Sequence, residues 1–187
     1  MILRGLWRLA KGDAAGIKEF GGGLDNFYAS LAPLIAFPLV GALVTALQVD
    51  WRVAVVGFLA RLCGVLVLPV LVYEFARFYG REPMWLRAAT ALNWSFWALL
   101  PVLLVGAFLG AILAQMGLSM RTAELATMGV MAAYLLWYRW FILRAGLGLN
   151  GWRAALIVLV SGTLIALFTV VPVALGLGPD PAQLSHL

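Results

Sequence analysis

Residues 53–79 decide the fold, and they read VAVVGFLARLCGVLVLPVLVYEFARFY. The apolar part of this stretch is long enough to cross the hydrocarbon core of a bilayer, which takes about 20 residues of α-helix. A helix that is apolar on all sides over such a length is typical of a membrane span. The stretch therefore predicts a transmembrane helix.

Four further stretches have the same character. The predicted spans are Tyr28 to Val49, Val53 to Tyr79, Leu86 to Gln115, Ala123 to Leu143 and Arg153 to Leu177. The composition agrees, because 64% of the 187 residues are hydrophobic, only 11% are charged and the mean hydropathy is +1.00. We expect an all-α, polytopic transmembrane bundle of five spans, in which residues 1–187 form a single integral membrane domain.

The segment before the first span has two sides. On a helical wheel Ile2, Leu6 and Leu9 form an apolar side, flanked by Leu3 and Trp7, and the basic residues lie opposite. Residues 1–20 are therefore predicted to form an amphipathic interfacial helix, which breaks near Gly12 and restarts with Asp13 as its cap. The segment lacks the apolar run and cleavage site of a signal peptide, so we expect it to be retained. A glycine-rich hinge, 21–27, follows it.

The basic residues predict the orientation. With the N-terminus inside, ten of the thirteen lie at the inner side: Arg4, Arg8, Lys11, Lys18, Arg77, Arg81, Arg87, Arg139, Arg144 and Arg153. Arg52 and Arg121 lie outside, and the tail, 178–187, has no Lys or Arg. The positive-inside rule then predicts a cytoplasmic N-terminus and a periplasmic C-terminus. The net charge of +5 indicates anionic lipid head groups at the cytoplasmic face as partners, not nucleic acid. Arginine far outnumbers lysine and Ala, Gly and Leu are abundant, which suggests a GC-rich bacterial genome, so we expect the membrane to be a bacterial inner membrane.

Residues that could carry chemistry are scarce. His186 is the only histidine and lies one residue from the end, and Cys63 is the only cysteine. Metal and haem sites rely on such ligands, and nucleophilic catalysis needs a positioned base. We therefore expect no metal, no cofactor and no enzymatic activity.

Arg61 is the most informative single residue. It lies eight residues into the second span, where a charge costs roughly 2.5 to 3.5 kcal/mol. Ala54, Gly57 and Gly64 share its helical face, so we expect Arg61 to face the bundle and not lipid. It is either a structural arginine, paired with Glu124 or another polar group, or a binding site for an anionic ligand or lipid.

Other polar and small residues in the spans allow more than one interpretation of their role. Asn93 predicts either an interhelical hydrogen bond or part of a ligand pocket. Glu74 and Arg77 are three residues apart and are expected to pair, with Arg139 able to join an inner ion-pair cluster. A further sequence feature is the GxxxG pair Gly106 and Gly110, which predicts close helix packing within this bundle or against a partner subunit.

The span layout, roughly Tyr28 to Leu177, resembles that of the Yip family of membrane proteins. The run WFILRAGLGL at 140–149, followed by WRAA at 152–155, looks like that family's last inner loop leading into its final span. In eukaryotes the family is implicated in vesicle traffic through small GTPases and uses a long cytoplasmic N-terminal region. This chain has only a short segment there, so we do not expect the GTPase role.

These observations favour a non-enzymatic, Yip-like integral membrane protein. Its predicted function is that of a scaffold or accessory subunit of a larger membrane complex, or of a protein that organises lipid. Its expected partners are membrane lipids, other membrane subunits or further copies of itself. The alternative is a small transporter or channel that uses an intramembrane site at Arg61.

Overall fold

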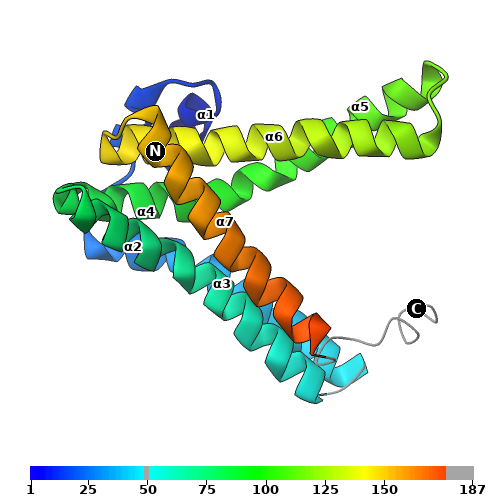
Figure 1. Ribbon diagram of the computed structural model, residues 1–187, viewed down its shortest axis with the longest axis horizontal. Coiled ribbons are helices and arrows are strands. Elements are labelled where there is room, and N and C mark those ends of the chain that lie inside the picture. The colour runs from blue at the N-terminus through cyan, green and yellow to red at the C-terminus, as the bar shows by residue number, and fades with distance from the viewer. Residues whose placement is uncertain (49–50, 176–187) are drawn as a thin grey trace.

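The computed structural model describes residues 1–48 and 51–175, and all regular structure in these ranges is helical. Figure 1 shows the arrangement. In chain order the elements are α1 (Ile2–Ala10), the 3-10 helix η1 (Ala14–Glu19), α2 (Leu24–Gln48), α3 (Trp51–Phe78), η2 (Glu82–Met84), α4 (Trp85–Trp94), η3 (Ser95–Ala98), α5 (Leu99–Gln115), α6 (Met120–Leu147) and α7 (Gly151–Ala174). Five stretches are long and apolar enough to cross a membrane, so the prediction of an all-α bundle with five spans is confirmed.

Several span boundaries differ from the predicted ones. The first span begins at Leu24, so the glycine-rich hinge is shorter than 21–27. The fourth begins at Met120, because the Ser119 hydroxyl accepts a hydrogen bond from the Thr122 N–H (3.2 Å). It ends at Leu147, where Gly148 caps the helix with a φ of 61° that suits glycine. The predicted ends Val49 and Leu177, and the tail 178–187 with His186, lie outside the described residues.

The third span is not one continuous α-helix. α4 ends at Trp94, and the 3-10 turn η3 connects it to α5. Pro101 lies in the first turn of α5, where its ring cannot donate a backbone hydrogen bond and crowds the carbonyl one turn before it. The tighter 3-10 turn before the proline accommodates this loss.

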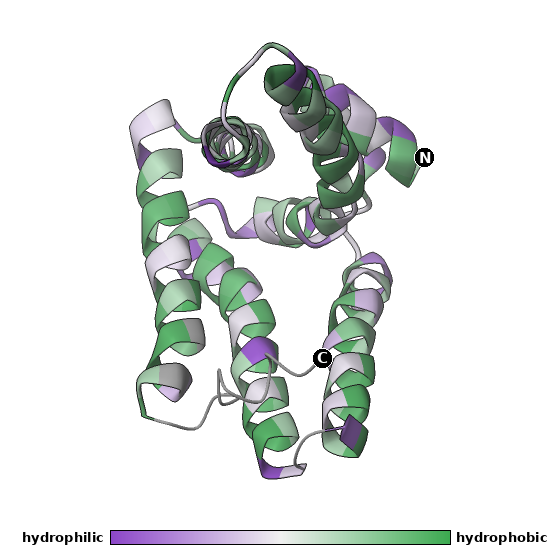
Figure 2. Cartoon of the chain, turned by 90° about the vertical axis from the view of Figure 1, so that its right-hand side faces the viewer, coloured by the Kyte–Doolittle hydropathy of each residue, from purple (hydrophilic) through white to green (hydrophobic). Residues whose placement is uncertain are grey.

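The helices form two arms that diverge from a shared end (Figure 1). One arm holds α2, α3 and α7, with α3 packed between the other two, and the other holds α5 and α6. α4 lies at the shared end and contacts α2, α3 and α6. Figure 2, viewed along the second arm, shows apolar residues along the length of the first arm.

The core lies at the shared end, not along the arms. Buried apolar side chains from α1, α3, α4, α6 and α7 meet there, among them Leu9, Val72, Leu92, Ile142 and Ile157. α1 was expected to lie on the lipid interface, but Leu6 and Leu9 are part of this core. The Tyr138 hydroxyl donates a hydrogen bond to the Leu6 carbonyl (3.1 Å) and so fixes α1 to α6. The segment is thus a packed element of the fold as well as an amphipathic one.

α1 and η1 form a short hairpin. Gly12 has a φ of 80°, which turns the chain, and the Asp13 carboxylate accepts the Ala15 N–H (2.9 Å) to start η1. Arg8 bridges the two pieces, because its guanidinium lies 2.7 Å from Asp13 and 3.5 Å from Glu19. The break that the sequence indicates at Gly12 and Asp13 is present in the structure.

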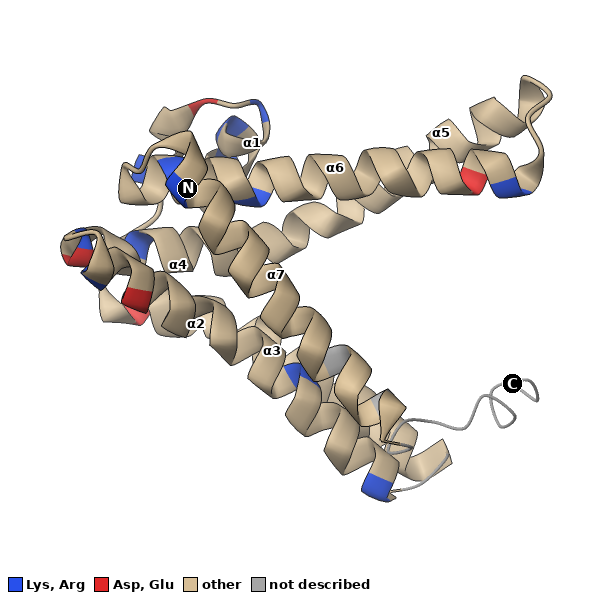
Figure 3. Ribbon diagram, viewed as in Figure 1, with Lys and Arg blue, Asp and Glu red and all other residues tan. Residues whose placement is uncertain are grey.

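Basic residues gather at the shared end of the two arms (Figure 3). The far ends of the arms hold few charges, among them Arg52 on α3 and Arg121 on α6. The core, the hairpin and most of the positive charge therefore occupy the same end of the molecule.

Candidate functional site

Arg61 lies on α3, exposed in this chain. Its Nη1 atom is 3.1 Å from the point where a Cβ on Gly41 of α2 would stand, so the guanidinium lies along the α2–α3 seam. Gly41 leaves room for it, since a larger residue would have to displace this group. Within the described residues no carboxylate oxygen lies within 4 Å of Arg61.

The glycines that share the face of Arg61 have no close neighbours. A Cβ added at Gly57 or at Gly64 would meet nothing within 4 Å. Arg61 itself lies against Gly41 of α2, as expected of a residue that faces the bundle, but no described atom would meet a Cβ at Gly57 or Gly64. Ala54, the other small residue expected on this face, is buried and lines the hollow between α2 and α3 together with Trp51 and Phe58.

Glu124 is not the partner of Arg61. It is an exposed residue near the start of α6, in the other arm, and no ion pair joins the two side chains in the part of the chain that the structure describes. The predicted pairing is wrong because the arms diverge away from their shared end, and both residues lie on the diverging parts. The charge of Arg61 thus has no acidic counterpart among the described residues.

Asn93 is a structural residue in this arrangement. It is buried in α4, and its side-chain amide donates to the Ser30 hydroxyl of α2 (2.9 Å). Ser30 in turn donates to the Phe27 carbonyl (2.6 Å). The Asn93 amide and the Ser30 hydroxyl are therefore hydrogen-bonded across the α2–α4 contact. This interhelical hydrogen bond is one of the two roles that the sequence predicted for Asn93.

The inner ion-pair cluster is only partly formed. Arg77 Nη1 lies 3.7 Å from Glu74 Oε2, as their spacing predicts, and both side chains are exposed. Arg139 lies on α6 and makes no ion pair with a described carboxylate. The expected three-residue cluster is thus a pair.

Gly106 and Gly110 pack against α6 of the same chain. A Cβ at Gly106 would collide with the Met131 side chain, and one at Gly110 would stand 3.5 Å from Thr127 Oγ1. Met131 and Thr127 are one helical turn apart, so two turns of α5 fit against two turns of α6. This GxxxG pair is therefore used within the bundle.

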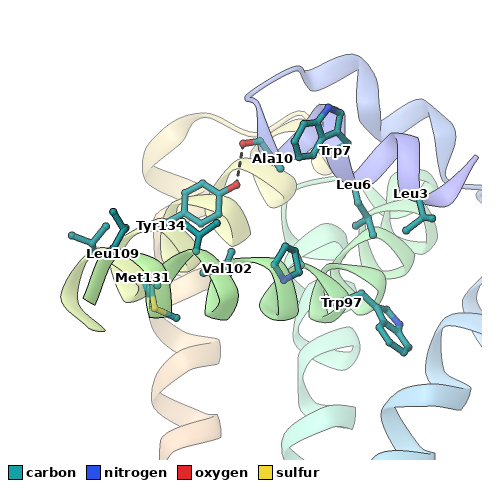
Figure 4. A pocket seen from close by; sticks show the side chains of 14 residues that line it. Leu3, Leu6, Trp7, Ala10, Trp97, Val102, Leu109, Met131 and Tyr134 are labelled. Carbon is teal, nitrogen blue, oxygen red and sulfur yellow. Dashed lines mark hydrogen bonds between the residues drawn. The ribbon is translucent and has the colours of Figure 1, made fainter. Parts of the chain in front are cut away.

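A second candidate site is an apolar groove between α1 and the α5–α6 pair (Figure 4). It has a volume of about 440 Å³, within the usual range for small-molecule sites. α1 contributes Leu3, Leu6, Trp7 and Ala10, and η3, α5 and α6 supply the remaining walls. Its most polar groups are the two indoles, Trp7 and Trp97, and the phenol of Tyr134, which already donates to the Ala10 carbonyl (3.1 Å).

The sequence did not predict this groove, although one signal for it was present. Leu3 and Trp7 lie beside the main apolar side of α1, and they remain 79% and 64% exposed when Leu6 and Leu9 enter the core. The apolar side of α1 is thus wider than the part that packs into the core, and this width indicated a second contact surface. Its location on α5 depends on long-range packing that a helical wheel does not contain.

Among the described residues, no group of three or more His, Cys, Asp or Glu side chains is placed to hold a metal ion. Comparison with protein-family models, curated proteins and solved structures found no match to this chain.

Proposed function

We propose that this multi-pass membrane protein is a non-enzymatic subunit that binds another membrane-embedded chain through the face of α3 formed by Gly57, Arg61 and Gly64, called here the Arg61 face. The observation that carries the proposal is an arginine in the middle of a span without an acidic partner among the described residues. Such a charge costs roughly 2.5 to 3.5 kcal/mol in a bilayer, so a group outside this chain is expected to compensate it.

The two glycines support a protein partner. Gly57 and Gly64 have empty space where a Cβ would stand, so packing within this chain does not require glycine there. Small residues allow the backbones of two helices to approach closely in a membrane. A helix seated on these glycines is well placed to offer a carboxylate or backbone carbonyl to Arg61.

A transport role for Arg61 has less support. Arg61 lines neither the groove between α1 and the α5–α6 pair nor a hollow of about 210 Å³ between α2 and α3. Both are lined almost wholly by apolar side chains, which do not recognise a polar solute. We therefore favour assembly over transport, with the bacterial inner membrane as the proposed location.

The test is the mass of the assembly after gentle extraction from native membranes. We expect the wild-type chain to run as a complex heavier than the 20.2 kDa monomer with its bound detergent. Arg61→Leu and Gly57→Leu should each shift the chain to the monomer, and Arg61→Lys should retain part of the complex. Gly129→Leu on α6 is the matched control, because a Cβ there also meets nothing within 4 Å, and it should leave the complex intact.

A stability measurement separates assembly from a structural role. Removing a costly unpaired charge should leave the melting temperature of the monomeric Arg61→Leu chain unchanged or raised. A wild-type chain that is monomeric in every mild detergent, or a complex that persists in Arg61→Leu, would contradict the proposal. So would a marked loss of monomer stability in that variant.

A further inference from the structure

We propose that the groove between α1 and the α5–α6 pair binds one acyl chain of an anionic phospholipid from the cytoplasmic leaflet. This site is separate from the Arg61 face, and the inference does not depend on the proposed assembly. It rests on the lining of the groove, its length and direction, and the charge at its entrance.

The lining selects an apolar occupant. Leu6, Val102 and Leu109 are typical of its walls, and the hydroxyl of Tyr134 is already used by the Ala10 carbonyl (Figure 4). A phosphate or sugar head group inside the groove would lose its hydration without finding partners, which costs several kcal/mol. A hydrocarbon chain has no such hydration to lose.

The length of the groove matches one leaflet. From Ala98, the last residue of η3, to Leu109 of α5 its wall extends over about 16 Å, at 1.5 Å per residue. Half of a hydrocarbon core that is roughly 30 Å thick is about 15 Å. An acyl chain that starts at the interface and ends near the bilayer centre therefore fits along this wall.

The direction of the groove also fits a lipid of the inner leaflet. Residues of α1 line the groove near the shared end of the arms, where basic residues gather (Figures 3 and 4). The groove then follows α5 and α6 toward the far end of their arm. A lipid bound in this way has its head group beside α1 and its chain within the membrane.

A positive charge lies at the entrance. Lys11 Nζ is 4.6 Å from the ring centroid of Trp7, which lines the groove. Arg4 and Arg8 already face Glu19 and Asp13, whereas no described carboxylate lies within 4 Å of Lys11. The ammonium of Lys11 is therefore available to a lipid phosphate, and charge complementarity commits the site to an anionic head group.

The experiment uses the full chain in nanodiscs made from equal parts of phosphatidylglycerol and phosphatidylcholine with identical acyl chains. Native mass spectrometry after release counts the lipids retained on each protein. We expect one tightly retained lipid on the wild type, with phosphatidylglycerol in excess. Val105→Trp, which fills the groove, should reduce retention about tenfold. Leu104→Trp is the matched control, because Leu104 is similarly exposed (61% against 57%) but lies outside the groove, and it should retain the lipid.

Two further variants test the details. Leu109→Trp fills the far end of the groove at a second exposed position, so a folding defect specific to Val105→Trp is separated from blockage. Lys11→Gln should keep a lipid bound but reduce the phosphatidylglycerol preference about fivefold, the factor that corresponds to ~1 kcal/mol for one basic residue near the surface.

Several results would overturn the inference. Retention by both groove-filling variants at the wild-type level would remove the groove as the site. Retention without a preference for phosphatidylglycerol would remove the anionic head group. A dimer mass that disappears in Val105→Trp would assign the groove to a second copy of the chain. Arg61→Leu should retain the lipid, which distinguishes failure here from failure of the proposed assembly.

Discussion

Single polar atoms fix α1 to the rest of the molecule. The hydroxyls of Tyr134 and Tyr138 reach two backbone carbonyls of α1, and Arg8 holds the turn that follows it. The sequence predicted Asp13 as a cap, since Gly12 before it breaks a helix. It did not predict that Arg8 would contact both Asp13 and Glu19, because that geometry exists only after the chain has turned back at Gly12.

The ion pair at Asp13 predicts a pH-dependent hairpin. Hydrogen bonds from Arg8 and from the Ala15 N–H hold the pKa of Asp13 below its ordinary value. A lowered pKa stabilises the folded hairpin above about pH 4, and this contribution is lost as the pH falls through the folded-state pKa. We expect the Ala15 amide to lose protection from hydrogen exchange between pH 6 and pH 2.

Asp13→Asn provides the control for this titration. The asparagine keeps a side-chain oxygen for the Ala15 N–H but cannot ionise. The hydrogen exchange of the Ala15 amide should therefore no longer lose protection between pH 6 and pH 2. The pKa of Arg8 is raised by the same contact, and its proton is lost only at high pH, outside this window. An Ala15 amide that responds to acid in the same way in both proteins would contradict the role of Asp13.

At the scale of elements, the α5–α6 contact is the one that the sequence described best. The GxxxG spacing predicted a close approach, and Gly106 and Gly110 do face α6. The break in the third span was not predicted. Pro33, Pro38 and Pro69 remain inside α-helices, whereas Pro101 follows a 3-10 turn, so a proline by itself does not determine where a helix is interrupted.

The two glycines of this contact should respond differently to the same substitution. Gly106→Ala places a methyl group against the flexible side chain of Met131, which has to move aside, so this variant should melt at a lower temperature than Gly110→Ala. Gly110→Ala meets Thr127 at an ordinary contact distance and should be close to neutral. Thermal unfolding of both variants in one detergent checks this. Equal melting temperatures would contradict the expected cost of moving the Met131 side chain.

At the scale of the whole molecule, hydropathy predicted the number of spans but not how they pack. Each span is apolar on nearly all sides, so its sequence does not show which side meets protein and which meets lipid. The glycine face around Arg61 resembled a packing face, yet no helix of this chain covers it at Gly57 or Gly64. In the same way, the apolar side of α1 predicted an interface without showing that Leu9 would be completely buried by protein.

The shared end of the arms joins the core, the α1–η1 hairpin and most of the basic residues into one unit. We infer that this unit lies on the cytoplasmic side, because the positive-inside rule applies to its arginines and lysines. The resemblance to the Yip family stays a prediction. The groove and the Arg61 face then belong to different parts of the membrane: the groove opens at the cytoplasmic interface, and Arg61 lies within the bilayer on the other arm.

Cysteine accessibility across the membrane tests this orientation most directly. In a Cys63→Ser background, single cysteines replace Lys18 in η1 and Met120 at the start of α6, both exposed positions. A membrane-impermeant maleimide is added to intact cells of a bacterial host. We predict that it labels Met120→Cys, and that Lys18→Cys reacts only after the membrane is permeabilised. Labelling of Lys18→Cys on intact cells, with or without labelling of Met120→Cys, would contradict a core and groove on the cytoplasmic side.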